Sequence, residues 1–182
     1  DNVGQLVLCA VDNSIIRNIT ITDGSGIFLR NSQYNTLYNL TITGAYYAIM
    51  VLSSYTNVSY STVSYNRYSL YISSNNNVFI NNNITHNTYH DVYLAISSPS
   101  YCNQYFENNT AGTGNLLAYY NTSGITIENN DTWGQLVLCN VDNSTVRNIT
   151  MEDQNGIYVA VTDNTTFANL SITGVPTALR LY

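Results

Sequence analysis

The chain has 182 residues, of which 45% are hydrophobic and only 9% are charged, and its formal net charge is −6. It has no lysine and no cluster of arginines, so nucleic acids and anionic membranes are excluded as expected partners. All of its apolar stretches are too short to span a bilayer.

Short apolar segments recur along the whole chain, and they are rich in Val, Ile and Tyr, which favour strands. In chain order they cover residues 5–9, 27–31, 48–52, 69–73, 91–95, 116–120, 135–139, 157–161 and 178–182. A second strand-like segment follows each one, as at residues 19–22, 40–43, 62–64 and 170–173. Helical periodicity is absent from these segments. The pattern therefore predicts a series of strand–turn–strand units separated by Asn, Ser and Gly turns.

A long internal duplication sets the period of these units. Residues 4–44 align without gaps with residues 134–174, and 23 of the 41 positions are identical. The offset of 130 residues contains six units, so one unit has about 22 residues. A unit of this length cannot bury its own apolar face, but stacked units share one continuous core.

The sequence thus predicts an all-β fold, a right-handed parallel β-helix of about 8–9 coils. We expect a single domain over residues 1–182, a rod on the order of 40 Å long at about 4.8 Å per coil. Side chains alternate along each strand. The alternation points these residues inward: Leu6, Leu8, Ile27, Leu29, Ile49, Val51, Leu70, Ile72, Val92, Leu94, Leu136, Leu138, Ile157, Val159, Leu179 and Leu181.

Asparagines recur at the bends, many of them within eleven Asn-x-Ser/Thr sequons. Stacked side-chain amides can bond from coil to coil, which predicts an internal ladder of Asn18, Asn39, Asn81, Asn148 and Asn169. A buried asparagine cannot carry a glycan, so we expect N-linked glycans at turn positions instead. The predicted glycan positions are Asn57, Asn121 and Asn164. The excess of sequons favours an exported protein.

The pattern Asn-x-Thr-Ile-Thr followed by Gly-Ile-aliphatic-x-aliphatic covers nearly the whole chain and resembles the parallel β-helix repeats of archaeal exported proteins. These include NosD-like repeat proteins and the surface-layer and sheath proteins of methanogens. The resemblance implies the β-helix fold and a location at the cell surface or in the cell envelope. It leaves function open, because similar repeats occur in polysaccharide lyases and hydrolases.

Carboxylates are too scattered for the enzymes that share this fold. Lyases of this type use a calcium-binding carboxylate cluster with a Lys or Arg base, and hydrolases place several Asp residues in adjacent coils. The nearest group here is Glu107, Glu128 and Asp131, to which we assign no catalytic role. The sequence therefore predicts no enzyme activity and no cofactor.

His86 and His90 are the only histidines, with Asp91 beside them and Cys102 one coil later. A His/His/Cys site is chemically feasible. Two exposed turn histidines are the simpler interpretation, so no metal ligand is predicted.

If the alternate residues point inward, the remaining ones form an outward stripe of apolar and aromatic side chains. The residues of this stripe are Val7, Phe28, Met50, Leu52, Tyr71, Tyr93, Val137 and Tyr158. Monomers rarely expose such a patch, which predicts a lateral interface in an assembly. Two alternatives stay open: the chain's own turns cover the stripe, or its tyrosines stack on carbohydrate.

Three cysteines, Cys9, Cys102 and Cys139, leave an odd count. Cys9 and Cys139 occupy equivalent positions six coils apart, about 29 Å at the usual strand spacing, and a disulfide requires Cα atoms within about 7 Å. Cys102 lies two coils from Cys139. We therefore expect intermolecular disulfides or free thiols.

Together these features predict a structural, non-catalytic subunit of an extracellular sheath, surface layer or filament. Its partners would be copies of itself and N-linked glycans, and contacts would use the stripe and uncapped strand edges at both ends. One alternative is a carbohydrate-active enzyme or carbohydrate-binding module. A second is an ice-binding solenoid, suggested by Thr20-x-Thr22 and Thr41-x-Thr43 but interrupted at residues 61–64 and 128–130.

Overall fold

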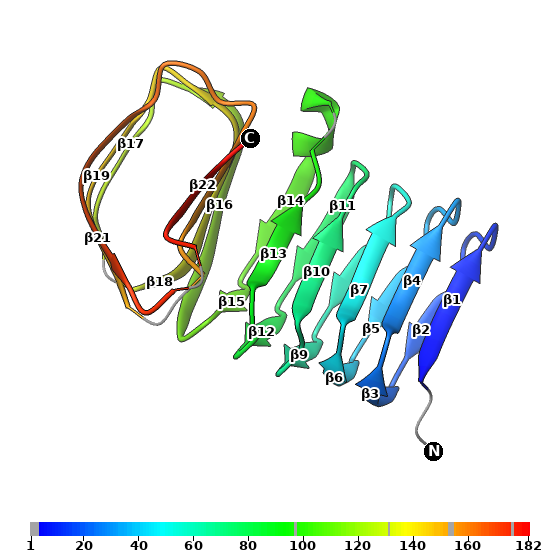
Figure 1. The fold of residues 1–182 in the computed structure, drawn as a ribbon. Coiled ribbons are helices and arrows are strands. Elements are labelled where there is room, and N and C mark those ends of the chain that lie inside the picture. Colours follow the sequence, from blue (N-terminus) through cyan, green and yellow to red (C-terminus); the bar gives the residue numbers. More distant parts are fainter. Residues whose placement is uncertain (1–3, 97, 131, 153–154, 176) are drawn as a thin grey trace.

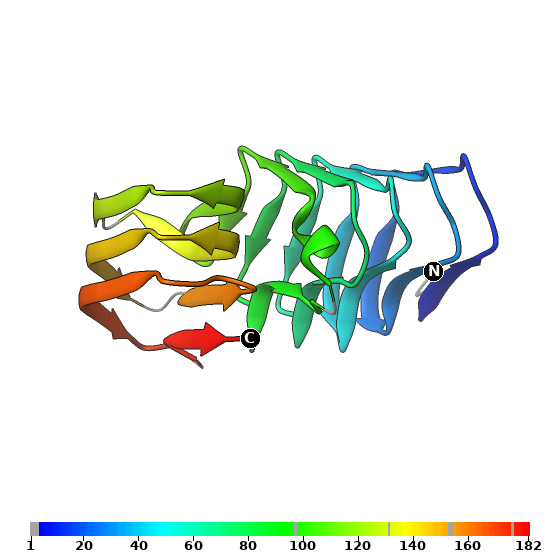
Figure 2. The ribbon, with the colours of Figure 1, turned by 90° about the horizontal axis from the view of Figure 1, so that it is seen from above.

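A computed structural model shows a chain of stacked β-coils (Figure 1). It describes residues 4–96, 98–130, 132–152, 155–175 and 177–182, without the side chains of residues 129 and 130. The coils form two stacks that wind about different axes. In Figure 1 the first stack is seen from the side and the second from its end. Figure 2 shows that the coils of the second stack are layered in a different direction from those of the first.

The first stack has five coils, and each coil contributes one strand to each of three parallel sheets. Sheet A contains β1 (Gln5–Cys9), β4 (Gly26–Arg30), β7 (Tyr47–Leu52), β10 (Tyr68–Ile72) and β13 (His90–Leu94). Sheet B contains β2 (Ile15–Arg17), β5 (Thr36–Tyr38), β8 (Asn57–Ser59), β11 (Asn77–Ile80) and β14 (Gln104–Glu107). Sheet C begins with β3 (Thr20–Gly24), β6 (Thr41–Ala45), β9 (Thr62–Ser64), β12 (Asn83–Thr85) and β15 (Thr110–Ala111).

The second stack has three complete coils and the start of a fourth. Its strands β16 (Gly114–Ser123), β18 (Trp133–Asp142), β20 (Ile157–Ala160) and β22 (Leu179–Leu181) extend sheet C to nine strands. Sheet D contains β17 (Thr126–Asn130), β19 (Thr145–Glu152) and β21 (Thr166–Thr173). Among the described residues, the one helical element is a short 3-10 turn, η1 (Pro99–Cys102). None of the described helices is long and apolar enough to cross a membrane.

The predicted fold class is confirmed, since the coils are right-handed and their partners in neighbouring coils lie 21 or 22 residues apart in sheet A. The predicted inward residues of β4, β7, β10 and β13 are almost completely buried. At the outer strands they are less covered: Leu6 is half-buried, and Leu179 and Leu181 are exposed. The apolar alternation therefore identified the core, and the ends of the stacks account for its exceptions.

Almost every corner of the coils has a residue in the left-handed backbone conformation. Asn18 and Asn39, with φ of 56° and 52°, are examples in neighbouring coils. Asparagine tolerates this conformation better than most residues because its short polar side chain bonds locally. The same corner residue commonly starts an Asn-x-Ser/Thr triplet, since the next residue points inward and the third points outward. The coil architecture thus explains much of the sequon excess.

The predicted asparagine ladder is wrong in its placement. Asn39 donates to Asn18 at 2.9 Å and Asn169 donates to Asn148 at 3.1 Å, but all four side chains are exposed. Asn81 is a half-buried corner residue with φ of 55°. The left-handed corner turns these side chains outward.

A buried ladder does exist, formed by asparagines that directly follow the left-handed corner residues. In sheet-to-sheet turns, Asn82 donates to the Val58 carbonyl at 2.8 Å and accepts from the Ser61 amide at 3.0 Å. Asn66 makes the equivalent bonds to Ile42 and Ala45. These amides satisfy backbone groups that the turns leave without a ladder partner.

The predicted single rod is corrected by a reversal between the two stacks. β15 and β16 pair antiparallel at Ala111 and Gly114, whereas the other strand pairs are parallel among the described residues. A Cβ atom on Gly134 would lie 1.4 Å from the Ala111 carbonyl oxygen, so only glycine allows the chains to cross here. After the reversal the coils stack in a new direction.

Candidate interaction surface

The junction between the stacks is formed by side chains that complete the open edge of β13. The Gln135 side chain accepts from the Val92 amide at 2.9 Å and donates to the Val92 carbonyl at 2.8 Å. Tyr158 donates its hydroxyl hydrogen to the Leu94 carbonyl. The second stack therefore replaces the hydrogen bonds that a sixth parallel strand would make with this edge.

Asp91 is completely buried at the same junction. Its carboxylate accepts hydrogen bonds from Asn87 at 2.6 Å, from Asn155 at 2.7 Å and from the Gly112 amide at 2.5 Å. Burial raises the pKa of Asp91 to about 7, and the hydrogen bonds from Asn87 and Gly112 act against this rise. The Asn155 side chain also accepts from the Asp91 amide, so Asn155 links the stacks twice.

His90 lies at the rim of the junction, where its Nε2 is 2.8 Å from Arg180. Burial lowers the pKa of His90 to about 4, and the charge of Arg180 lowers it further. The Arg180 guanidinium lies over the rings of Tyr93 and Tyr182, 4.8 and 4.7 Å from their centroids. A neutral histidine and an aromatic-bound cation therefore close this side of the junction.

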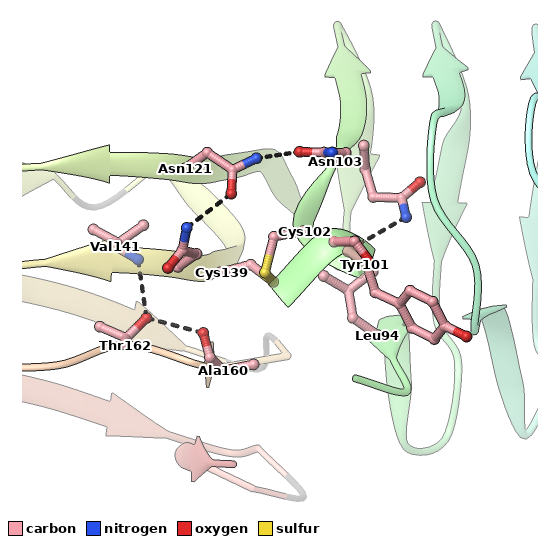
Figure 3. Close-up of a disulfide and its surroundings, with 12 residues drawn as sticks. Leu94, Tyr101, Cys102, Asn103, Asn121, Cys139, Val141, Ala160 and Thr162 are labelled. Carbon is pink, nitrogen blue, oxygen red and sulfur yellow. Dashed lines mark hydrogen bonds between the residues drawn. A yellow bond between two sulfur atoms is a disulfide. The ribbon is translucent and has the colours of Figure 1, made fainter. Parts of the chain in front are cut away.

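A disulfide joins Cys102 in η1 to Cys139 in β18, with a Cα–Cα distance of 5.3 Å (Figure 3). The prediction of intermolecular bonds or free thiols is thus wrong for these two residues. It assumed a straight rod, whereas the second stack turns and brings the outer face of β18 against the end of the first stack. Cys9 is a free, exposed thiol, as one form of the prediction allowed.

The predicted lateral interface divides into an open half and a covered half. In sheet A, the register places Val7, Phe28, Met50, Tyr71 and Tyr93 in one outward column. Val7 is 52% exposed and the other four are half-buried. We call this column, with its neighbour Leu52, the apolar stripe.

Val137 and Tyr158 are only 2% exposed, so their assignment to an open lateral interface is corrected. Together with Cys139 and Ala160 they pack into the core of the first stack, as its end cap. This half of the predicted stripe is therefore covered by the coils of the first stack, and not by the long turns that the sequence left open as an alternative.

Tyrosines beside the stripe form a continuous surface of stacked rings. Tyr47, Tyr68 and Tyr89 stack with centroid distances of 5.0 and 5.2 Å and interplanar angles of 18° and 16°. The Arg67 guanidinium lies over Tyr46 and Tyr89, 4.6 and 5.1 Å from their centroids. Residues one coil apart meet at the strand spacing, so a tyrosine repeated in each coil gives a stack of parallel rings.

The carboxylates considered for catalysis do not converge among the described residues. Glu107 accepts a hydrogen bond from the Tyr105 hydroxyl at 2.9 Å, and Glu128 pairs with Arg147. Asp131 lies outside the described residues. An open polar hollow in the second stack is lined by Asn121, Thr122, Ser123, Asn140 and Asp142.

The residues considered for metal binding are also separated. His86 is exposed and stacks on Tyr65 with centroids 5.1 Å apart, His90 faces Arg180, and Cys102 is in the disulfide. Within the described part of the chain, no three His, Cys, Asp or Glu residues form a group that could hold a metal ion.

The predicted glycan positions differ in their exposure. Asn121 and Asn164 are exposed at left-handed corners, whereas Asn57 is half-buried in β8 with its Oδ1 fully enclosed. A glycan requires access to the amide nitrogen. The Asn121 amide nitrogen donates to Asn103, so the structure favours Asn164. Thr20 and Thr41 occupy one register position of sheet C, but Asn83 replaces threonine two coils later.

Comparison with known proteins identifies one family. A family model described as a right-handed beta helix region matches residues 3–83 and 47–176. Searches of curated proteins and of solved structures found no match.

Proposed function

Since the chain belongs to the right-handed beta helix family, we propose that it is a structural, non-catalytic subunit of an extracellular assembly. The proposed assembly is a sheath, surface layer or filament of the archaeal type, built from copies of the same chain. The observation that carries the proposal is the apolar stripe, which lies along the outer face of the first stack on a regular strand spacing.

The stripe suits association between large, regular surfaces. Phe28, Met50 and Tyr71 are in neighbouring coils, so their side chains form a continuous ridge and not isolated contacts. Burial of apolar surface contributes about 25 cal/mol per Å², and a ridge of several coils can supply a large apolar contact. The disulfide supports an exported location, because disulfides persist in oxidising compartments.

The test is the association state of the whole chain as a function of concentration, measured by sedimentation velocity and negative-stain electron microscopy. Wild-type chains should form elongated oligomers, and Met50→Asp should shift them toward monomers. Thr41→Asp, an exposed change on sheet C, is the matched control and should assemble like wild type. Wild-type chains that stay monomeric at every concentration would contradict the proposal.

The stacked tyrosines favour carbohydrate binding as a second candidate function. Tyr47, Tyr68 and Tyr89 present an ordered aromatic surface, and Arg67 adds a donor beside it. The three rings stack on one another, so they offer ring edges and hydroxyl groups to a sugar, and tyrosine hydroxyls can hydrogen-bond sugar hydroxyls. Affinity electrophoresis in neutral and acidic polysaccharides measures this binding. Retardation that Tyr68→Ala abolishes, with no change in association state, would favour the carbohydrate-binding function.

A further inference from the structure

The face that caps the first stack occurs twice in the sequence. The capping face consists of Gln135, Val137 and Cys139 on β18 with Tyr158 on β20. The internal duplication places Gln5, Val7, Cys9 and Phe28 at the corresponding positions 130 residues earlier. Three of the four residues are identical, and the fourth remains aromatic.

The backbone presents the two sets in the same way. Val137 pairs with Tyr158 across β18 and β20, and Val7 pairs with Phe28 across β1 and β4. Both strand pairs are parallel and in the same register relative to the inward residues. The two faces therefore have the same spacing and orientation of side chains.

The two faces differ in what covers them. In the second stack, Gln135 bonds both backbone groups of Val92 and Cys139 is bonded to Cys102. In the first stack, Gln5, Val7 and Cys9 are exposed, and Cys9 is a free thiol. The covered face on β18 and β20 thus shows which kind of surface the open face on β1 and β4 can fit, namely the end of a five-coil stack.

We propose that the Gln5–Phe28 face is a docking site for the end of another five-coil stack of the same kind, one that carries a cysteine at the position of Cys102. Gln5 bonds the edge strand of that stack as Gln135 bonds β13, and Val7 and Phe28 close its core. In a folded copy of this chain the end of the five-coil stack is already closed by β18 and β20, and Cys102 is bonded to Cys139. The incoming stack is therefore one whose end is not closed by a second stack of its own. This inference rests on the proposed function, because it specifies one contact through which such units join.

Cys9 forms a disulfide with the cysteine of the incoming stack. Each thiol loses a proton, one S–S bond forms, and the two electrons reduce the disulfide of a thiol oxidant, such as oxidised glutathione, to two thiols. The non-covalent contact has fewer polar bonds than the observed junction. Phe28 lacks the hydroxyl of Tyr158, and Ser25 stands where Asn155 does. The disulfide therefore carries more of the stability at this second site.

The test is a tandem chain in which residues 1–130 are followed directly by residues 1–182. The fusion keeps the natural register, because Asp1 of the second copy then stands where Asp131 stands in the original chain. After refolding with oxidised and reduced glutathione, free thiols are alkylated and the disulfides are mapped by peptide mass spectrometry. The expected new bond joins Cys102 of the first copy to Cys9 of the second.

Val7→Asp in the second copy is the variant that tests the face. It should abolish the new bond in the tandem chain, while the same change in the single chain leaves its stability unchanged, because Val7 is exposed there. The Cys102–Cys139 bond of the second copy reports that the chain has folded. If that bond forms while Cys102 of the first copy and Cys9 of the second are alkylated, the inference is wrong.

Val7 and Phe28 also belong to the apolar stripe, but the mapped disulfide can be told apart from self-association. The new bond is intramolecular in the tandem chain, so it can form even if the single chain never assembles. Conversely, a single chain that assembles while its tandem form lacks the bond would retain the proposed function and overturn the docking site.

Discussion

Asn82 is the position where the buried ladder can be tested most sharply. Its side chain accepts from the Ser61 amide at 3.0 Å and donates to Val58 at 2.8 Å and to Asn109 at 3.0 Å. Asn82→Ala leaves the buried Ser61 amide without its acceptor, which costs about 1–3 kcal/mol, and removes two hydrogen bonds worth about 0.5–1.5 kcal/mol each. The free energy of unfolding should therefore fall by about 2–6 kcal/mol.

The adjacent Asn83 is the matched control, since its exposed side chain only accepts from Thr110 at 2.8 Å. Asn83→Ala should change the unfolding free energy by about 0.5 kcal/mol or less. Urea unfolding followed by circular dichroism and by Trp133 fluorescence measures both variants, and the two signals show whether the stacks unfold together. Equal costs for Asn82→Ala and Asn83→Ala would refute the argument that buried amides hold the turns.

Three further predictions concern the core, the junction and its disulfide. Ile42→Asp buries an unpaired charge in the first stack and should prevent folding, whereas Thr20→Asp faces solvent and should be tolerated; soluble expression of both to the same level would show that the inward register is wrong. His90 has a folded-state pKa of about 4, below its ordinary 6.5, so its contribution to stability is complete above about pH 6.5 and is lost as the pH falls toward 4. As the pH falls from about 6.5 to about 4, the unfolding free energy of the His90→Gln variant should therefore decrease less than that of the wild type, as measured by urea unfolding at each pH. An equal or larger decrease in the variant would contradict this role of His90. Reduction of the junction disulfide should lower the unfolding free energy of the second stack by about 2–4 kcal/mol; unfolding curves that coincide with and without reductant would refute this.

The repeating coil could be predicted from sequence because its cause is local. Apolar residues equivalent to Ile27, Leu29 and Ile42 recur along the chain at the period of the coil, and only stacking of the coils buries them together. The burial of each asparagine is harder to predict from sequence, because an outward corner residue and a buried residue are only one position apart. Asn81 and Asn82 are neighbours with the same side chain, and only the left-handed φ of Asn81 distinguishes their directions.

The junction could not be predicted from sequence because it depends on a single change of direction. The pattern of β18 resembles that of β1, and both read as ordinary strands with one inward face. A sequence feature that marks the junction is the interruption of the repeat before residue 116, where Gly112 and Gly114 flank a short reversal. Without that turn, distances along a straight rod separate Cys102 from Cys139, and both faces of β18 cannot be buried.

The left-handed corners also limit how densely sugars can cover this protein. Asn18 and Asn39 are both sequon residues at one corner of neighbouring coils, so their side chains are only about one strand spacing, roughly 4.8 Å, apart. A branched glycan is far wider than that, and it would also replace the amide hydrogen that Asn39 donates to Asn18. Occupancy in such a column must therefore alternate, and a fully sequon-bearing corner would display a sugar on every second coil at most.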